Sequence, residues 1–132
     1  MPTFLRGWDG KVTQGTADAA LVAMLSWEVE ITQAVEELGP FLNDSGTTYN
    51  SRGGVSAKWS WKGVVPSGGD TNQTAVVNAL SSGIDIKQTF VSTGAGSIVI
   101  PNSLVETIKR GHDSKNGPTI EASGRNNGAF TY

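Results

Sequence analysis

Residues 21–31 read Leu-Val-Ala-Met-Leu-Ser-Trp-Glu-Val-Glu-Ile, and an apolar side chain occupies every odd position of this stretch. From Ser26 onward the even positions are polar, with Glu28 and Glu30 following the serine. Because successive side chains of a strand point to opposite faces, this alternation predicts a β-strand with one dry face. The segment forms either one bent strand or two strands joined by a bulge near Met24.

A second alternating run follows about thirty residues later. Its apolar positions are interleaved with Ser56, Lys58, Ser60 and Lys62, and they comprise Val55, Ala57, Trp59 and Trp61. The polar face of one run carries carboxylates and that of the other carries ammonium groups, so we expect the strands to pair with the two lysines opposite Glu28 and Glu30. The tryptophans are then predicted to pack in the core, although an exposed aromatic platform for sugar is the alternative.

The stretch between the two runs is rich in Gly, Asn, Asp, Ser and Thr from about residue 40 to residue 54. It is far longer than a hairpin turn, and long loops in small domains are usually functional. Residues 33–38 are predicted to form the base of this loop, because Gly39-Pro40 would end any helix that began there.

One helix is predicted, over residues 71–82. Asp70 is a suitable N-cap, with Gln73 three residues later, and Gly83 provides the C-terminal stop. Further strands are expected at about 11–14, 84–90, 97–100 and 119–122. Pro101 is expected to close a hairpin arm, residues 124–128 to form a turn, and residues 130–132 to dock on the domain.

Residues 103–110 fit two structures. Ser103 and Glu106 resemble a capping box, whereas the β-branched residues Val105, Thr107 and Ile108 favour a strand, which we prefer. The sequence thus predicts a single domain spanning residues 1–132. Its fold class is mainly β, an antiparallel β-sandwich or barrel-like domain with one α-helix and a long inter-strand loop.

Composition excludes several classes of function. The 132 residues carry a net charge of −2, which argues against tight non-specific binding of nucleic acid. No apolar run approaches the ~20 residues of a membrane helix, and no secretory signal is visible, so synthesis in a cytoplasm is expected. The chain has no cysteine and one histidine, His112, in a polar loop. We therefore expect no enzyme activity, no metal and no cofactor.

Glu28 and Glu30 lie two positions apart on one face, a spacing that suits a carboxylate pair. A glycosidase would also need a carboxyl partner across a cleft, and the sequence identifies none. A solvated or channel-lining face is therefore the preferred interpretation. Assembly is then the most economical function.

The order of the segments resembles that of one protein family. It runs from Gly10-Lys11-Val12-Thr13 through the Ser26–Ile31 strand, a long loop, the Ala57–Gly63 strand and one helix to the closing Gly-Arg-Asn-Asn-Gly-Ala-Phe. This order, over residues 8–132, resembles that of the major tail tube proteins of tailed bacteriophages. The related tube protein of a phage-like particle is an equivalent match.

The resemblance implies a subunit of hexameric rings that stack into a hollow tail tube for genome delivery. Its partners would be copies of itself and other tail proteins, namely the tape measure, the terminator and, in a contractile tail, the sheath. DNA would pass without specific binding, and the protein would reside in the virion tail after synthesis in the host cytoplasm. The alternative is a monomeric carbohydrate-binding β-sandwich that uses Trp8 or Tyr49 as a stacking surface.

Residue roles also follow from the resemblance. The loop at about 36–54 is expected to contact adjacent subunits and rings, with Phe41, Leu42 and Tyr49 as anchors. The candidates for lining the lumen are Glu28, Glu30, Lys58 and Lys62.

Overall fold

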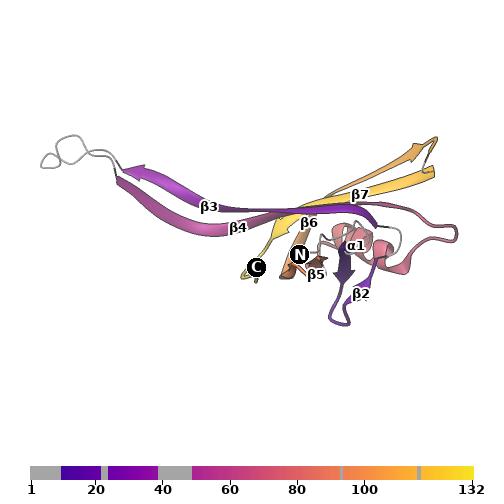
Figure 1. Cartoon of the computed structure of the whole chain (residues 1–132), viewed down its shortest axis with the longest axis horizontal. Helices are drawn as coiled ribbons and strands as arrows, with labels where there is room; N and C mark the ends of the chain where they lie inside the picture. Colours follow the sequence, from indigo (N-terminus) through magenta and orange to yellow (C-terminus); the bar gives the residue numbers. More distant parts are fainter. Residues whose placement is uncertain (1–9, 22–23, 39–48, 93, 116) are drawn as a thin grey trace, which may run out of the picture.

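The computed structural model describes residues 10–21, 24–38, 49–92, 94–115 and 117–132. These residues form seven strands and one helix: β1 (Gly10–Gln14), β2 (Ala19–Ala20), β3 (Met24–Leu38), β4 (Tyr49–Val64), α1 (Thr71–Ser82), β5 (Ile86–Ser92), β6 (Gly96–Asp113) and β7 (Gly117–Asn126). The prediction of a mainly β chain with one helix is confirmed. Figure 1 shows a body of strands and helix from which the ends of β3 and β4 project as a long arm.

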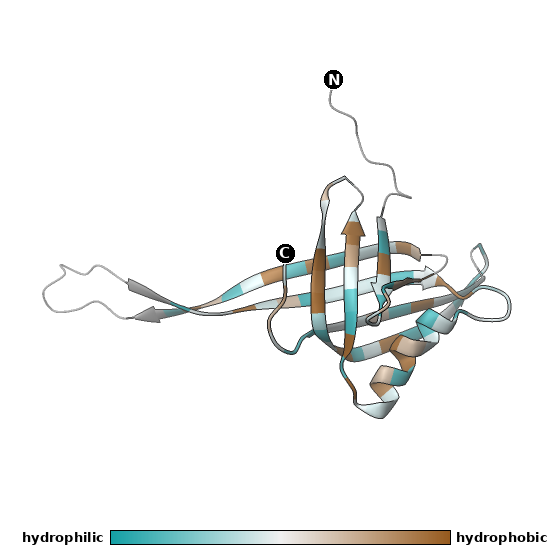
Figure 2. Ribbon diagram, turned by 90° about the horizontal axis from the view of Figure 1, so that it is seen from below, coloured by the Kyte–Doolittle hydropathy of each residue, from teal (hydrophilic) through white to brown (hydrophobic). Residues whose placement is uncertain are grey.

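All strands belong to one antiparallel sheet in the order β2-β1-β5-β6-β7-β4-β3, which is not closed into a barrel. Strand β6 belongs to both halves of the sheet, because residues 96–103 pair with β5 whereas residues 103–113 pair with β7. The sheet bends at this strand, so that β1 and β5 cross over β3 and β4 (Figure 2). The sandwich-like arrangement is thus one sheet folded over on itself.

Pro101 lies inside β6 and does not end a hairpin arm, so that expectation was wrong. Proline has no N–H to donate to a ladder, and it is tolerated here because β6 changes its pairing partner at this point. The register on β5 shifts between Ile86 and Gln88, which pair with Ser103 and Ile100. The strand assignment for residues 103–110 is confirmed, since the whole segment continues β6.

Residues 124–126 also continue a strand, β7, rather than forming the expected turn. The C-terminal segment docks as predicted. Val99 and Thr131 exchange two backbone hydrogen bonds of 2.9 Å, and the rings of Phe130 and Tyr132 lie 5.3 Å apart.

Aromatic side chains form the core between the two halves of the sheet. Trp59, Trp61 and Phe90 are each no more than 2% exposed. The Phe90 ring on β5 lies 6.0 Å from the Trp59 ring on β4 and 5.6 Å from the half-buried Trp27 ring on β3. The predicted core role of Trp59 and Trp61 is confirmed, so neither indole is an exposed platform for sugar.

A buried hydrogen-bonded chain links the same two halves. The Trp61 Nε1 donates to the Gln88 Oε1 over 3.2 Å, and the Gln88 Nε2 donates to the Ser103 Oγ over 2.8 Å. Gln88 and Ser103 are fully buried, so these bonds satisfy polar groups that would otherwise be costly in the core.

Helix α1 covers one end of the apolar side of the sheet. Asp70 caps it as predicted by accepting a 2.9 Å hydrogen bond from the Asn72 N–H, and Gly83 ends it at φ 66°. The buried Gln73 donates to the Val64 carbonyl over 3.0 Å. Asn72 accepts from Gln14 and donates to the Ala20 carbonyl, so the start of the helix is tied to both β1 and β2.

We expect Trp61→Ala to lower the free energy of unfolding by about 3–5 kcal/mol, since it empties a buried indole site and leaves Gln88 without a donor. Trp59→Ala should cost a similar amount. Leu25→Ala is the matched control, because Leu25 is 49% exposed and its truncation should change stability by under ~0.5 kcal/mol. Chemical denaturation measures all three, and tryptophan variants as stable as the control would contradict the core assignment.

Candidate assembly surfaces

The strands β3, β4, β7 and β6 form a four-stranded layer with one polar face, called here the polar face. Side chains in register alternate between the core and this face from row to row. Three polar rows cross the layer: Ser26-Lys62-Glu121-Lys109, Glu28-Ser60-Ser123-Thr107 and Glu30-Lys58-Arg125-Leu104. Between them run buried rows such as Val29-Trp59-Gly124-Val105.

The predicted pairing of glutamates with lysines is half right. Lys58 lies opposite Glu30 as expected, but Lys62 lies opposite Ser26, and Glu28 lies opposite Ser60. The register shift between Met24 and Ser26 does not affect these pairs, which follow the continuous register from Ser26 to Gln33. Lys62 instead forms an ion pair with Glu121 on β7, with 3.7 Å between the Lys62 Nζ and the Glu121 Oε1.

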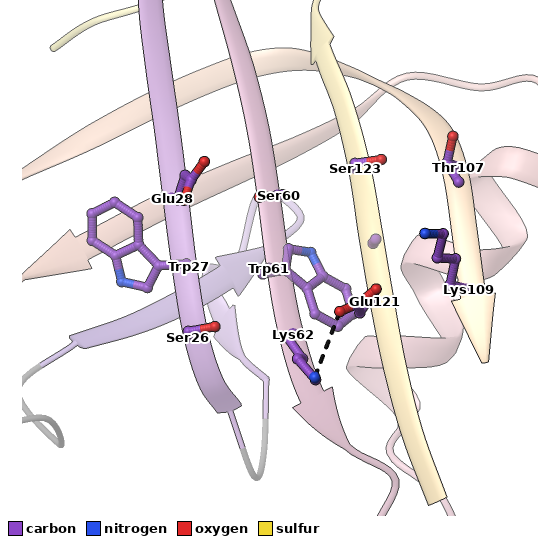
Figure 3. Close-up of a pocket in the computed structure, with 11 residues that line it drawn as sticks. Ser26, Trp27, Glu28, Ser60, Trp61, Lys62, Thr107, Lys109, Glu121 and Ser123 are labelled. Carbon is purple, nitrogen blue, oxygen red and sulfur yellow. Dashed lines mark ion pairs between the residues drawn. The ribbon is translucent and has the colours of Figure 1, made fainter. Parts of the chain in front are cut away.

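The polar face carries balanced charge. Two shallow depressions of about 290 and 300 Å³ lie on it, the first of which is shown in Figure 3. Their linings include four carboxylates, Glu28, Glu30, Glu106 and Glu121, and four cations, Lys58, Lys62, Lys109 and Arg125. A face with equal numbers of both signs has no net field to hold a polyanion.

Sequence reasoning found only the β3 and β4 residues of this face. The β7 and β6 residues Glu121, Ser123, Arg125, Thr107 and Lys109 were missed, although they complete the same rows. The alternation from Ile120 to Arg125 carried a signal for β7. The β6 signal was obscured by a bulge between Val105 and Thr107, which breaks the period of two.

Gly124 allows β6 and β7 to approach each other beside this bulge. A Cβ at this position would lie 1.9 Å from the Leu104 carbonyl oxygen and 2.8 Å from the Trp59 Cζ2. Any side chain there would therefore push apart the two strands or the core beneath them.

The four-stranded layer has two unpaired edges among the described residues. No described strand pairs with the outer side of β3, which ends the sheet order. Beyond Ser103, β6 has β7 on one side, and no described strand pairs with its other side. Unpaired edges present backbone donors and acceptors to other chains. The edges run antiparallel to each other, because each of the three pairings in the layer is antiparallel.

The arm seen in Figure 1 is the distal half of the β3–β4 ribbon, here residues 32–38 and 49–56. All the arm side chains that the structure describes, residues 32–36 and 52–56, are exposed. They include Val35 at 60% and Val55 at 40% exposure. A two-stranded ribbon is at best marginally stable alone in water, so this arm has the character of a contact element.

The connection between the two strands is therefore shorter than the loop predicted from the sequence. Residues 33–38 belong to β3 and residues 49–54 to β4, so the assignment of residues 40–54 to one loop was wrong at its C-terminal end. Gly53 permits the ribbon to continue there, because a Cβ would lie 2.9 Å from the Ala34 Cβ. Tyr49 lies opposite Leu38 at the end of the described ribbon. Phe41 and Leu42 lie outside the described residues.

Comparison with known proteins shows the fold. No family model matches the chain, and no curated protein matches it in sequence. A chain in the structure of the virion of a native gene transfer agent particle superposes with a TM-score of 0.79 at 12% identity, over 97% of this chain and 98% of that one. A chain in the tail of an empty gene transfer agent particle, solved with C6 helical symmetry, gives 0.76 at 14% identity over 98% of each chain.

A third structure comes from an extracellular contractile injection system. Its sheath/tube terminator contains a chain that gives a TM-score of 0.64 at 14% identity, covering 99% of this chain and 94% of that one. The resemblance to tail tube proteins is thus confirmed at the level of the fold. In the part of the chain that the structure describes, no helix has both the length and the apolar character needed to cross a membrane.

We expect Gly124→Ala to destabilise the domain by about 1–3 kcal/mol, because the added methyl group meets a backbone carbonyl that cannot rotate away. Gly54→Ala in the arm is the control, since nothing lies within 4 Å of its Cβ position. Urea denaturation compares the two. Equal stability of the two variants would show that β6 and β7 have room to separate at Gly124.

Proposed function

We propose that the protein is a structural subunit of the tail tube of a phage-like particle, in which hexameric rings stack into a hollow tube for genome delivery. The observation that carries this proposal is the four-stranded layer, whose two outer edges pair with no described strand and whose polar face is hollowed. An edge of one copy can accept the opposite edge of the next copy as a further antiparallel strand. Such head-to-tail contacts close into a ring when the rotation divides a circle.

A ring of six such layers leaves room for a channel. Barrel diameter grows with strand number, and porins of about 16–18 strands already enclose an aqueous pore. Six copies of four strands exceed that number. The sixfold symmetry of the similar gene transfer agent tail supports this ring size.

The polar face is the proposed lining of the channel. Its opposite face packs against Phe90 and the rest of the core and is therefore unavailable to solvent. Glu28, Glu30, Lys58 and Lys62 would face the bore. Because the cations of the face are matched by carboxylates, DNA would pass without being held.

The arm is the proposed contact with neighbouring subunits and rings. Its exposed Val35 and Val55 are not among the described residues that pack against the core, and an assembly would cover them. Phe41, Leu42 and Tyr49 stay the proposed anchors of this contact. The other partners would be the tape measure, the terminator and, in a contractile tail, the sheath, and the finished location would be the virion tail.

Tube formation tests the function directly. Concentrated purified protein should show rings or tubes by negative-stain microscopy. Replacing residues 34–54 with Asn-Gly should join Gln33 to Val55, which are already in register, through a two-residue turn. This armless variant should keep a β-rich circular dichroism spectrum and form no tubes, because the arm contributes to the assembly and little to the fold.

A milder variant tests the exposed apolar side chains of the arm without changing its length. Val35→Ser with Val55→Ser leaves the ribbon intact and removes its exposed apolar contacts, so tubes should require a several-fold higher protein concentration. A wild-type chain that stays monomeric under all conditions would reject the proposed function. An armless variant that polymerises normally would reject only the role of the arm.

Cysteine labelling tests which face lines the channel, since the wild-type chain has no cysteine. Ser60→Cys lies at the centre of the polar face, and Asn78→Cys is an exposed site on α1. In monomers both thiols should react with a maleimide attached to a large carrier protein. In tubes only Asn78→Cys should react with it, whereas a small maleimide should label both. Carrier labelling of Ser60→Cys inside intact tubes would place the polar face on the outside.

A further inference from the structure

The two edges of the four-stranded layer present charged groups of opposite sign that form no ion pair within the described subunit. On the polar face, β3 presents the exposed Glu28 and Glu30. The β6 edge presents the exposed Lys109, whereas Glu106 is paired with Arg125 and Asp113, at the end of the strand, accepts a hydrogen bond from the Lys115 N–H. Among the described residues, no ion pair involves Glu28, Glu30 or Lys109. Two carboxylates on one edge and an ammonium group on the other thus have no ion-pair partner among the described residues, although the Glu30 Oε1 accepts a 3.5 Å hydrogen bond from the Thr32 Oγ1.

Resting on the ring proposed above, we propose that Glu28 and Glu30 of one subunit bind Lys109 of the next across the joint between β3 and β6. The partner is thus a second copy of this chain, and the charges decide which edge meets which. Opposite charges on facing strands stabilise a pair, whereas like charges on facing strands destabilise it.

The contact between Lys109 and the two glutamates can form in more than one register of the β3–β6 joint. The faces of joined strands match only when the offset is an even number of residues. Ser26 and Lys109 belong to the same row of the subunit. If two subunits join with no offset, Lys109 of one lies opposite Ser26 of the other, and Glu28 is then a diagonal neighbour within reach of the lysine side chain. An offset of two residues places Lys109 opposite Glu28, and an offset of four places it opposite Glu30. Two carboxylates in succession thus allow the contact at offsets of zero, two or four residues in this direction.

The same charges discriminate against incorrect joints. Two β3 edges that met would bring carboxylates together, and two β6 edges would bring lysines together. Closed two-fold pairs through either edge are therefore disfavoured, and the head-to-tail joint that leads to a ring is the one favoured.

Charge reversal in two separate variants tests the joint. Glu28→Lys with Glu30→Lys makes both edges positive, and Lys109→Glu makes both edges negative. Each variant alone should form no tubes at the wild-type assembly concentration and should need roughly tenfold more protein. An equimolar mixture should assemble, because each variant then offers the edge that the other lacks. High salt screens the charges, so it should bring the assembly concentrations of the two variants closer to that of the wild type.

Lys62→Glu with Glu121→Lys is the matched control, since it reverses two charges of the same face that pair within the subunit. It should assemble like the wild type. The proposal is overturned if either edge variant alone assembles at the wild-type concentration, or if the mixture fails while the wild type forms tubes. In both of those outcomes the tube function stands. A wild-type chain that forms no tubes would overturn the function and the joint together.

Discussion

The packing of Trp59 and Trp61 against the β5 side of the core determines which surfaces the subunit can offer to others. The indoles fill the space between two halves of one sheet. That sheet can fold over because the pairing of β6 passes from β5 to β7 at Ser103, just after the irregularity that contains Pro101. When the two halves pack face to face, the apolar side of the four-stranded layer is buried in the core. The surfaces of this layer that remain available for contact with other chains are the polar face, the two edges and the arm.

This arrangement separates stability from assembly. The residues that hold the subunit together are buried and largely apolar, with Gln88 and Ser103 as polar links that specify one alignment of the two halves. The residues available for assembly are exposed and contribute little to the monomer, since exposed ion pairs are typically worth under ~1 kcal/mol. The proposed assembly can therefore be disrupted by a mutation that leaves the chain folded, so experiments can test the candidate surfaces separately from the fold.

The sequence predicted those parts of the fold in which local patterns and tertiary structure agree. The period of two over residues 21–31 and 55–62 located the β3–β4 pair and its buried tryptophans, although β3 begins only at Met24 and Leu25, expected on the dry face, is 49% exposed. The caps Asp70 and Gly83 located the helix to the residue. Predictions failed where a local signal was overridden. Pro101 and Gly124 resembled strand ends but lie inside strands, because one sits where pairing changes and the other where strands approach closely.

The candidate surfaces were predicted less completely than the fold. Glu28, Glu30, Lys58 and Lys62 were found because a regular alternation displays them. Lys109 and Glu121 were missed, because their position depends on which strand lies next to β4, and strand order is a long-range property that periodicity does not encode. The sequence likewise did not predict the free edge of β6, because that edge exists only where β6 stops pairing with β5 beyond Ser103.

The open edge of β3 also determines how the free subunit behaves before it is incorporated. A long strand with one side unpaired among the described residues is a template for uncontrolled strand addition, and the exposed valines of the arm add to that hazard. In the proposed tube, incorporation and aggregation would compete for the same newly made chains, and the outcome would depend on how fast tube ends bind new subunits. The yield of tubes would then be a kinetic quantity, set by the supply of tube ends as much as by the stability of the fold.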